Sequence, residues 1–359
     1  MRQFADVEEL SELVRETLGA GCRVIAVDRL RGGTKKGVYR FRLDGTGTAG
    51  VIVYRWADAE NFWPGERGTD PADPFAPASG LAPFLAAQRS LAGLGVRVPR
   101  VHRVDDSRSR YPADVAVVED VSGGTLEALF ETDRAGAANA LGELAGALQV
   151  MHRHRSRHPG RVGLPDRAEV SCERRVLDRA LRHVDEAAER DARIAAAGGA
   201  LRDRLRELAG RVPPRAEYGL IHGELGPDHV LIDAGGHPVL IDIEGLMHFD
   251  VEWEHVFLRL RFGEHYPALA QPGLDPRRLD LYLLAMHLSL VAGPCGCSTG
   301  TSRIVRSCTG SPSTTRTRRW HSCGVRCSTR RSARPAGFRK TAVRLQCTLP
   351  GSPSTAGRS

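Results

Sequence analysis

Hydrophobic residues in the first third of the chain fall into short stretches bounded by glycine, proline or aspartate. Apolar side chains recur at helical spacing from Val7 to Leu18. Further stretches rich in Val, Ile and Tyr are typical of strands, and their Gly-rich connections favour antiparallel pairing. The expected elements are a helix over 7–18, strands over 22–30, 37–44 and 49–56, a loop over 57–80, a helix over 82–94, and strands over 96–106 and 113–121.

After Ser122 the spacing of apolar residues becomes mainly helical. Two short apolar stretches within 229–245 flank Gly235-Gly236 and predict a hairpin. The helices expected here cover 134–156, 173–193, 198–210, 251–262 and 276–292, with a break between the second and third at Gly198-Gly199. The pattern indicates an α+β protein with two lobes: a small antiparallel-sheet lobe over 1–121 and a mainly helical lobe over 122–293, with a cleft between them.

Composition agrees with a globular protein of this kind. The chain has 359 residues, of which 41% are hydrophobic and 26% charged, so a chain disordered throughout is excluded. No apolar run reaches the roughly 18 residues of a membrane helix, and the N-terminus lacks the basic-then-apolar order of a signal peptide. We therefore expect a cytoplasmic protein with no membrane partner. The oligomeric state is not indicated.

The last 65 residues differ from everything before them. Residues 295–359 contain no Asp or Glu, 12 Arg, one Lys, 21 Ser or Thr and six of the eight cysteines. Without those 13 basic residues, the first 294 carry 38 Lys or Arg against 43 Asp or Glu. The net charge of +8 therefore comes from the tail, and the body gives no electrostatic reason to expect a nucleic-acid partner.

Three interpretations of this tail, residues 294–359, stay open. Cys295-x-Cys297 and Cys323-x3-Cys327 are close pairs that a zinc module could use, although the remaining cysteines have no partner at such spacing. A basic disordered arm is the second interpretation, because so few large apolar residues cannot form a core. The third is a shifted reading frame, which fits the abrupt loss of acidic residues after an amphipathic helix.

Candidate chemistry is concentrated in IHGELGPDHVLID and the LIDIEG that follows it. Glu224 lies in a loop beside a histidine and a glycine, and Asp242 ends an apolar strand, with Glu244 two residues further on. One carboxylate that accepts a proton and another that holds a divalent cation are the minimum for phosphoryl transfer, which depends on positioning and charge neutralisation.

These motifs resemble the aminoglycoside phosphotransferase and small-molecule kinase family, whose members have a protein-kinase-like fold. That family's catalytic loop reads His-Gly-Asp-Leu-His-Pro-Gly-Asn and its metal strand reads Ile-Asp; here the corresponding residues are 222–229 and 241–242. The resemblance covers about residues 20–292. It implies ATP and Mg²⁺ as cofactors and a small molecule with a hydroxyl group as the phosphate acceptor.

The resemblance also implies roles for individual residues of the helical lobe. Glu224, with His222 beside it, would be catalytic, although the family has Asp at position 224 and the extra methylene moves the carboxylate by about 1.3–1.5 Å, a displacement that can cost about a hundredfold in rate. Asp242 would hold the metal. The family's metal-binding Asn is His229 here, a poor Mg²⁺ ligand, so Asp228 is a further candidate.

In the sheet lobe, a glycine-rich hairpin would cover the nucleotide phosphates. Alone, these glycines fit a plain turn equally well; the predicted phosphate-binding residues are Gly32, Gly33, Thr34 and Gly37. The family's nucleotide-pairing Lys on the third strand is absent, and Arg55 is the candidate substitute, or else a residue of a solvated strand face. No Lys–Glu pair is recognisable.

Two further features concern ligand recognition. Backbone groups from Glu119 to Val121, where the lobes join, are expected to bind the adenine ring. Acidic residues around the helix over 251–262 fit either an ordinary capped helix or attraction of a cationic acceptor; they are Asp250, Glu252 and Glu254. The hypothesis is an ATP-dependent phosphotransferase, and the alternative is a kinase-like nucleotide-binding protein with weak or no turnover.

Overall fold

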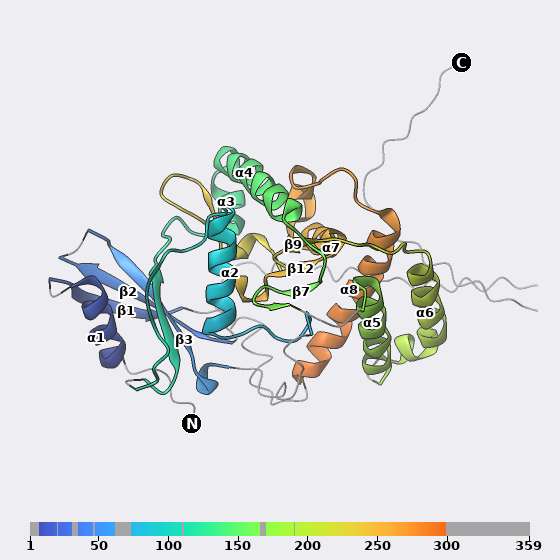
Figure 1. The fold of residues 1–359 in the computed structure, drawn as a ribbon, viewed down its shortest axis with the longest axis horizontal. Helices are drawn as coiled ribbons and strands as arrows, with labels where there is room; N and C mark the ends of the chain where they lie inside the picture. Colours follow the sequence, from blue (N-terminus) through green and yellow to red (C-terminus); the bar gives the residue numbers. More distant parts are fainter. Residues whose placement is uncertain are drawn as a thin grey trace, which may run out of the picture.

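The computed structural model (Figure 1) shows a sheet lobe and a mainly helical lobe. It describes residues 7–19, 21–30, 35–45, 47–61, 73–109, 111–165, 170–189 and 191–298. Gly32, Gly33, Thr34 and the predicted tail beyond Ser298 therefore lie outside the described residues.

The sheet lobe is built on five antiparallel strands, as the sequence pattern predicts. Their order across the sheet is β1 (Arg23–Arg29), β2 (Gly37–Asp44), β3 (Gly50–Trp56), β5 (Asp114–Glu119) and β4 (Val101–Asp105). Helix α1 (Val7–Leu18) covers the outer face, and α2 (Leu81–Gly93) covers the inner face toward the helical lobe (Figure 1). A short helix, η1 (Asp58–Glu60), follows β3.

The alternation of side chains along β3 sorts its residues between these two faces. Val51 and Val53 pack in the outer cluster with α1, whereas Ile52 and Tyr54 pack in the inner cluster with α2. The inner cluster continues into the helical lobe and includes Leu225 of the predicted catalytic loop. One apolar core therefore holds that loop against the inner face of the sheet.

The helical lobe contains the five helices that the pattern predicts, with one break placed differently, and two short helices that it does not predict, over 126–132 and 263–268. They are α3 (Leu126–Thr132), α4 (Arg134–Arg153), α5 (Cys172–Ala188), α6 (Ala192–Gly210), α7 (Val251–Phe262), η5 (Gly263–Ala268) and α8 (Pro276–Ser298). The predicted break at Gly198-Gly199 is wrong, because α6 runs through both glycines. The break between α5 and α6 lies before Ala192 instead. The Asp191 carboxylate accepts the Arg193 N–H at 2.9 Å and caps α6.

A second small sheet in the helical lobe was not predicted. Its strand order is β6 (Arg155–Ser156), β9 (Tyr218–Ile221), β12 (Met247–Phe249), β7 (Gly160–Arg161) and β8 (Leu164–Pro165). The predicted hairpin is confirmed as β10 (Val230–Ile232) and β11 (Pro238–Leu240). Strands of two to four residues are too short to show a period of two in the sequence.

The lobes are connected by the segment that follows β5. The Gly123 N–H donates to the Ile232 carbonyl at 3.0 Å, and Thr125 forms an isolated bridge with Leu231. The connection is thus anchored on β10, next to the predicted catalytic loop. Among the helices that the structure describes, none has the length and apolar character needed to cross a bilayer.

Candidate active site

The predicted catalytic loop begins where β9 ends and finishes in a short helix, η3 (Pro227–His229). Leu225 is fully buried in the inner core, whereas the neighbouring Glu224 side chain is exposed. An exposed carboxylate next to a buried anchor is presented to solvent by a fixed backbone. Glu224 is therefore placed where a ligand can reach it.

His222 connects this loop to the predicted metal strand. Its Nε2 lies 2.9 Å from the Ile241 carbonyl, and because a carbonyl only accepts, Nε2 carries the proton. Burial, together with the neighbouring His229, lowers the pKa of His222 to about 4, so the ring is neutral at neutral pH. This contact fixes the His222 ring against the backbone of the residue before Asp242.

Glu254, on α7, binds the backbone of the same loop. Its carboxylate accepts the backbone N–H groups of His222 at 2.6 Å and Gly223 at 3.2 Å. The side chain is fully buried, and burial raises its pKa to about 7. The only signal for this role in the sequence is an acidic residue among apolar ones on one helix.

Asp242 has a backbone conformation that is rare for any residue other than glycine. Its φ is 58° and its ψ is 43°, the left-handed region, immediately before η4 (Ile243–Gly245). Such a conformation is typical of functional sites, where the surrounding structure enforces it. Lys36 Nζ lies 3.3 Å from Asp242 Oδ1 and also forms an ion pair with Glu244.

The arrangement of these carboxylates fits a magnesium ion. The Asp242 side chain is 49% exposed, and Glu244 Oε2 is buried with no hydrogen-bond partner among the described residues. Within the part of the chain that the structure describes, no three His, Cys, Asp or Glu side chains form a metal cage. Magnesium needs none, since it keeps several waters and is held by one or two carboxylates together with substrate phosphates.

His229 lies close to the backbone of Glu224 and to the side chain of Asp242. Its Nδ1 is 2.9 Å from the Glu224 backbone carbonyl, so Nδ1 is the donor, and its Nε2 is 3.9 Å from Asp242 Oδ2. One imidazole therefore joins the catalytic loop to the metal strand. We call Lys36, His229, Asp242 and Glu244 the interlobe cluster.

Asp228 is placed differently from His229. Its carboxylate accepts Arg261 Nη2 at 2.6 Å, and its other oxygen is 3.9 Å from His229 Nε2. Asp228 is thus beside the interlobe cluster but already paired with an arginine of α7.

Two basic side chains among the described residues interact electrostatically with Glu224. Arg161 and Arg179 both interact electrostatically with Glu224 and with Asp73. Arg161 is 7% exposed, and its Nε has no hydrogen-bond partner among the described residues. Burial lowers the pKa of both arginines, which places them in a partly desolvated environment.

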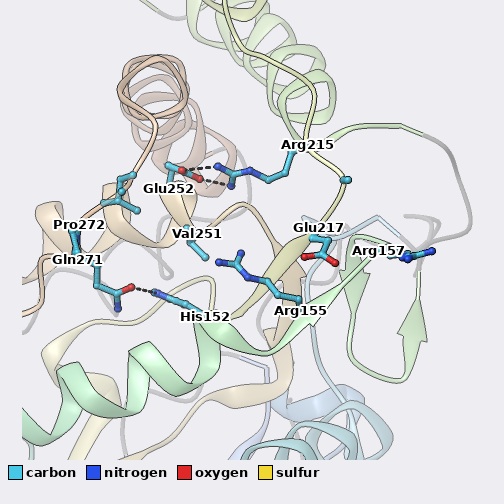
Figure 2. Close-up of a pocket in the computed structure, with 12 residues that line it drawn as sticks. His152, Arg155, Arg157, Arg215, Glu217, Val251, Glu252, Gln271 and Pro272 are labelled. Carbon is cyan, nitrogen blue, oxygen red and sulfur yellow. Dashed lines mark hydrogen bonds and ion pairs between the residues drawn. The ribbon is translucent and has the colours of Figure 1, made fainter.

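The acidic residues around α7 do not face a cationic acceptor. Asp250 and Glu252 are fully buried, and Arg215 binds Glu252 through two hydrogen bonds of 2.7 and 2.8 Å (Figure 2). Figure 2 shows this pair beside a cavity of about 730 Å³ that Arg155 and Glu217 also line. Glu217 comes directly before β9, the strand that ends at the catalytic loop. Attraction of a cationic acceptor by these acids is therefore wrong, since they stabilise the interior.

The sheet-lobe candidates are only partly described. A Cβ on Gly37 would lie 2.7 Å from the side chains of Glu60 and Tyr39, so a packing constraint explains this glycine. Arg55 pairs with the fully buried Glu60 at 3.4 Å. Arg55 lies on the same outer face of β3 as Val53, two residues away. The structure therefore does not bring Arg55 to the interlobe cluster. Lys36 is there instead, a residue that sequence reasoning missed.

The residues predicted to meet the adenine ring lie at the lobe junction. Glu119 ends β5; its carboxylate pairs with Arg97 and accepts the Arg100 N–H at 3.0 Å, and its backbone N–H donates to the Arg100 carbonyl. Val121 is buried. Binding of adenine by this segment stays a prediction.

Comparisons with known proteins agree with this geometry. The sequence model described as "Phosphotransferase enzyme family" matches residues 29–287, and the chain therefore belongs to that family. No curated protein matches the sequence.

Solved structures show the same fold at low sequence identity. Spectinomycin phosphotransferase APH(9)-Ia, in complex with ADP and spectinomycin, is 12% identical, with a TM-score of 0.58 over 85% of this chain and 93% of its own. A thermostable mutant of aminoglycoside phosphotransferase APH(4)-Ia is 18% identical, with a TM-score of 0.54 over 84% of this chain and 99% of its own. Another APH(4)-Ia structure, a ternary complex with ADP and hygromycin B, has a TM-score of 0.52 at 17% identity and covers 84% of this chain and all of its own.

Proposed function

We propose that the protein transfers the γ-phosphate of ATP to a hydroxyl group of a small molecule, with Mg²⁺ as cofactor. The observation that carries this proposal is the His229 ring, which joins the Glu224 carbonyl to Asp242 beside the unsatisfied Glu244 Oε2. Family membership and relatives whose structures contain ADP with an antibiotic support it.

In this reaction the acceptor oxygen bonds to the γ-phosphorus as the bond to the β–γ bridging oxygen breaks. Glu224, exposed at the loop, would orient the acceptor hydroxyl and take its proton. Asp242 and Glu244 would hold Mg²⁺, which neutralises phosphate charge when bound. His222 and Glu254 would keep the loop in register with these carboxylates.

The acceptor is proposed only as a hydroxyl compound. Because Arg161 and Arg179 interact electrostatically with Glu224, a test panel needs hydroxy acids and sugar phosphates as well as amino sugars. ADP formation and phosphorylated product are measured together, so that transfer is distinguished from hydrolysis by water.

The proposal is tested with Glu224→Gln, which keeps the shape of the side chain and removes the base. We expect kcat to fall by about 10²–10⁴-fold, the usual contribution of a general base. Glu217→Gln is the matched control, since this exposed glutamate precedes β9 whereas Glu224 follows it. Equal kcat values for Glu224→Gln and the wild type would refute the role of Glu224.

Glu224→Asp separates transfer from binding alone. It restores the shorter side chain of the resembled loop, and a rise in activity identifies Glu224 as a genuine but displaced base. A protein whose melting temperature shifts with Mg-ATP, but which never transfers phosphate in either form, is instead the nucleotide-binding alternative.

A further inference from the structure

Lys36 is a buried lysine contributed by the sheet lobe to carboxylates of the helical lobe. It immediately precedes β2, is 8% exposed, and contacts Asp242 at 3.3 Å as well as Glu244. Its Nζ also lies 4.9 Å from the centroid of the Tyr54 ring, a cation–π distance. Three side chains from two separate segments thus meet at the Lys36 ammonium.

The Lys36 ammonium lies between two carboxylates of the helical lobe. An ammonium has three N–H donors, and the two carboxylates account for two of them. The third N–H has no partner among the described residues and can bind an anionic oxygen.

The inner face of β3 offers no other cation at this place. Tyr54 occupies that face and lies under the Lys36 ammonium, while the adjacent Arg55 points to the outer face and pairs with Glu60. The family's strand-three lysine is missing from the sequence, yet a positive charge is present, supplied by the residue that precedes β2, the strand paired with β3.

We propose that Lys36 is the residue that binds the nucleotide phosphates, with Glu244 as its orienting partner, in place of a lysine on β3. This inference rests on the proposed function. Lysine is a compact charge suited to phosphate oxygens, and a carboxylate partner fixes its otherwise flexible stem. Lys36, the residue just before β2, therefore performs the task expected of a lysine on β3, and Glu244 is its carboxylate partner.

The test measures nucleotide affinity, which does not require turnover. The dissociation constant of AMP-PNP with Mg²⁺ is determined by calorimetry for the wild type, Lys36→Met and Lys35→Met. We expect Lys36→Met to weaken binding by about 10–100-fold, as expected for loss of a charged hydrogen bond. Lys35, its partly exposed neighbour, is the matched control, and Lys35→Met should stay within about twofold of the wild type.

Two further variants keep the result interpretable. Lys36→Met leaves Glu244 buried without its partner and can unfold the protein, so Lys36→Met/Glu244→Gln removes both charges together. We expect the double variant to fold and to bind AMP-PNP at least tenfold more weakly than Glu244→Gln alone, the reference that already lacks this proposed metal ligand. Lys36→Met/Tyr54→Lys returns an ammonium to the inner face of β3 and should recover part of the affinity.

A folded Lys36→Met/Glu244→Gln variant that binds AMP-PNP as tightly as Glu244→Gln would overturn the assignment of Lys36 while leaving the proposed function intact. A wild-type protein that binds no AMP-PNP at saturating concentration would overturn both.

Discussion

Two clusters of buried charge in this protein contain similar residues and differ in how completely their carboxylate oxygens are paired. In the interior of the helical lobe, Asp250 and Glu252 are surrounded by Arg215, Arg278 and other donors, and all four carboxylate oxygens have partners. In the interlobe cluster, Glu244 Oε2 has no partner in the described residues, and the Asp242 side chain is half exposed.

The difference shows which acids are available to a ligand. A buried carboxylate with all its oxygens paired is part of the fold, because removing one partner leaves the other charge unsatisfied. Asp242 differs because its side chain is half exposed and its backbone is in the left-handed region, and Glu244 differs because one buried oxygen has no partner among the described residues. Acidic residues only eight positions apart along the chain, Asp242 and Asp250, therefore have different tasks.

The largest effect is expected from Asp242→Asn. Asparagine tolerates the left-handed backbone but loses the charge, so phosphate transfer should fall by about 10³-fold or more while the melting temperature changes little. Transfer kinetics and thermal unfolding are measured on the same preparation. Asp280→Asn, on the exposed face of α8, is the control, and transfer by Asp242→Asn at the control's rate would contradict the metal role.

Asp250→Ala should lower the stability of the protein and leave the activity of the folded molecules unchanged. It leaves Arg278 and Arg215 without their shared carboxylate in the interior, and we expect the free energy of unfolding to fall by about 3–5 kcal/mol. Urea unfolding measures the loss, and whatever remains folded should keep its activity per molecule. A loss below about 1 kcal/mol would show that this cluster is not structural.

Glu254→Gln should remove a pH dependence of stability. The pKa of Glu254 is about 7 when folded and 4.5 ordinarily, so the folded state holds the extra proton between those values. The stability that this proton contributes, at most about 3 kcal/mol, is fully present below pH 4.5 and is lost as pH rises through 7.

The glutamine variant keeps a carbonyl acceptor for the His222 and Gly223 N–H groups. Subtracting its unfolding free energy from that of the wild type cancels the buried histidines, whose lowered pKa values give the opposite slope. The difference should decrease between pH 4.5 and 7. A flat difference would mean that Glu254 is charged throughout.

The smallest effect is expected from His229→Asn. The imidazole Nε2 that faces Asp242 favours Mn²⁺ over Mg²⁺ relative to an amide oxygen, so the ratio of transfer rates with the two metals should fall by about tenfold in the variant. His237→Asn, in the β10–β11 turn where it contacts Glu143 at 2.8 Å, is the control. An unchanged ratio would place His229 outside the metal shell.

Sequence reasoning succeeded where the information is contiguous or strongly periodic. The five strands of the sheet lobe and most helices follow from periodicity, and the catalytic loop from eight consecutive residues. Very short strands carry no such signal, which is why the second sheet was missed. The break assigned to Gly198-Gly199 followed helix propensity, whereas packing keeps Gly198 buried within α6 and the cap at Asp191 decides the start.

The position of Lys36 could not be predicted from the sequence. It stands 206 positions before Asp242, and nothing local indicates their contact. Successive residues of β3 point to opposite faces of the sheet, but the sequence does not show which face is the inner one. The sequence therefore does not show whether Tyr54 or Arg55 faces the helical lobe. The position of the lysine in the resembled family points to Arg55. The contacts of the folded protein point to Lys36 instead.

The most direct measurement is a manganese titration followed by electron paramagnetic resonance, with AMP-PNP present, on the wild type and on Asp242→Asn/Glu244→Gln. Manganese replaces magnesium at oxygen ligands and its bound and free signals are distinct. We expect about one nucleotide-dependent manganese site per wild-type chain and none in the double variant. Equal manganese binding by the two proteins would contradict a metal site at Asp242 and Glu244.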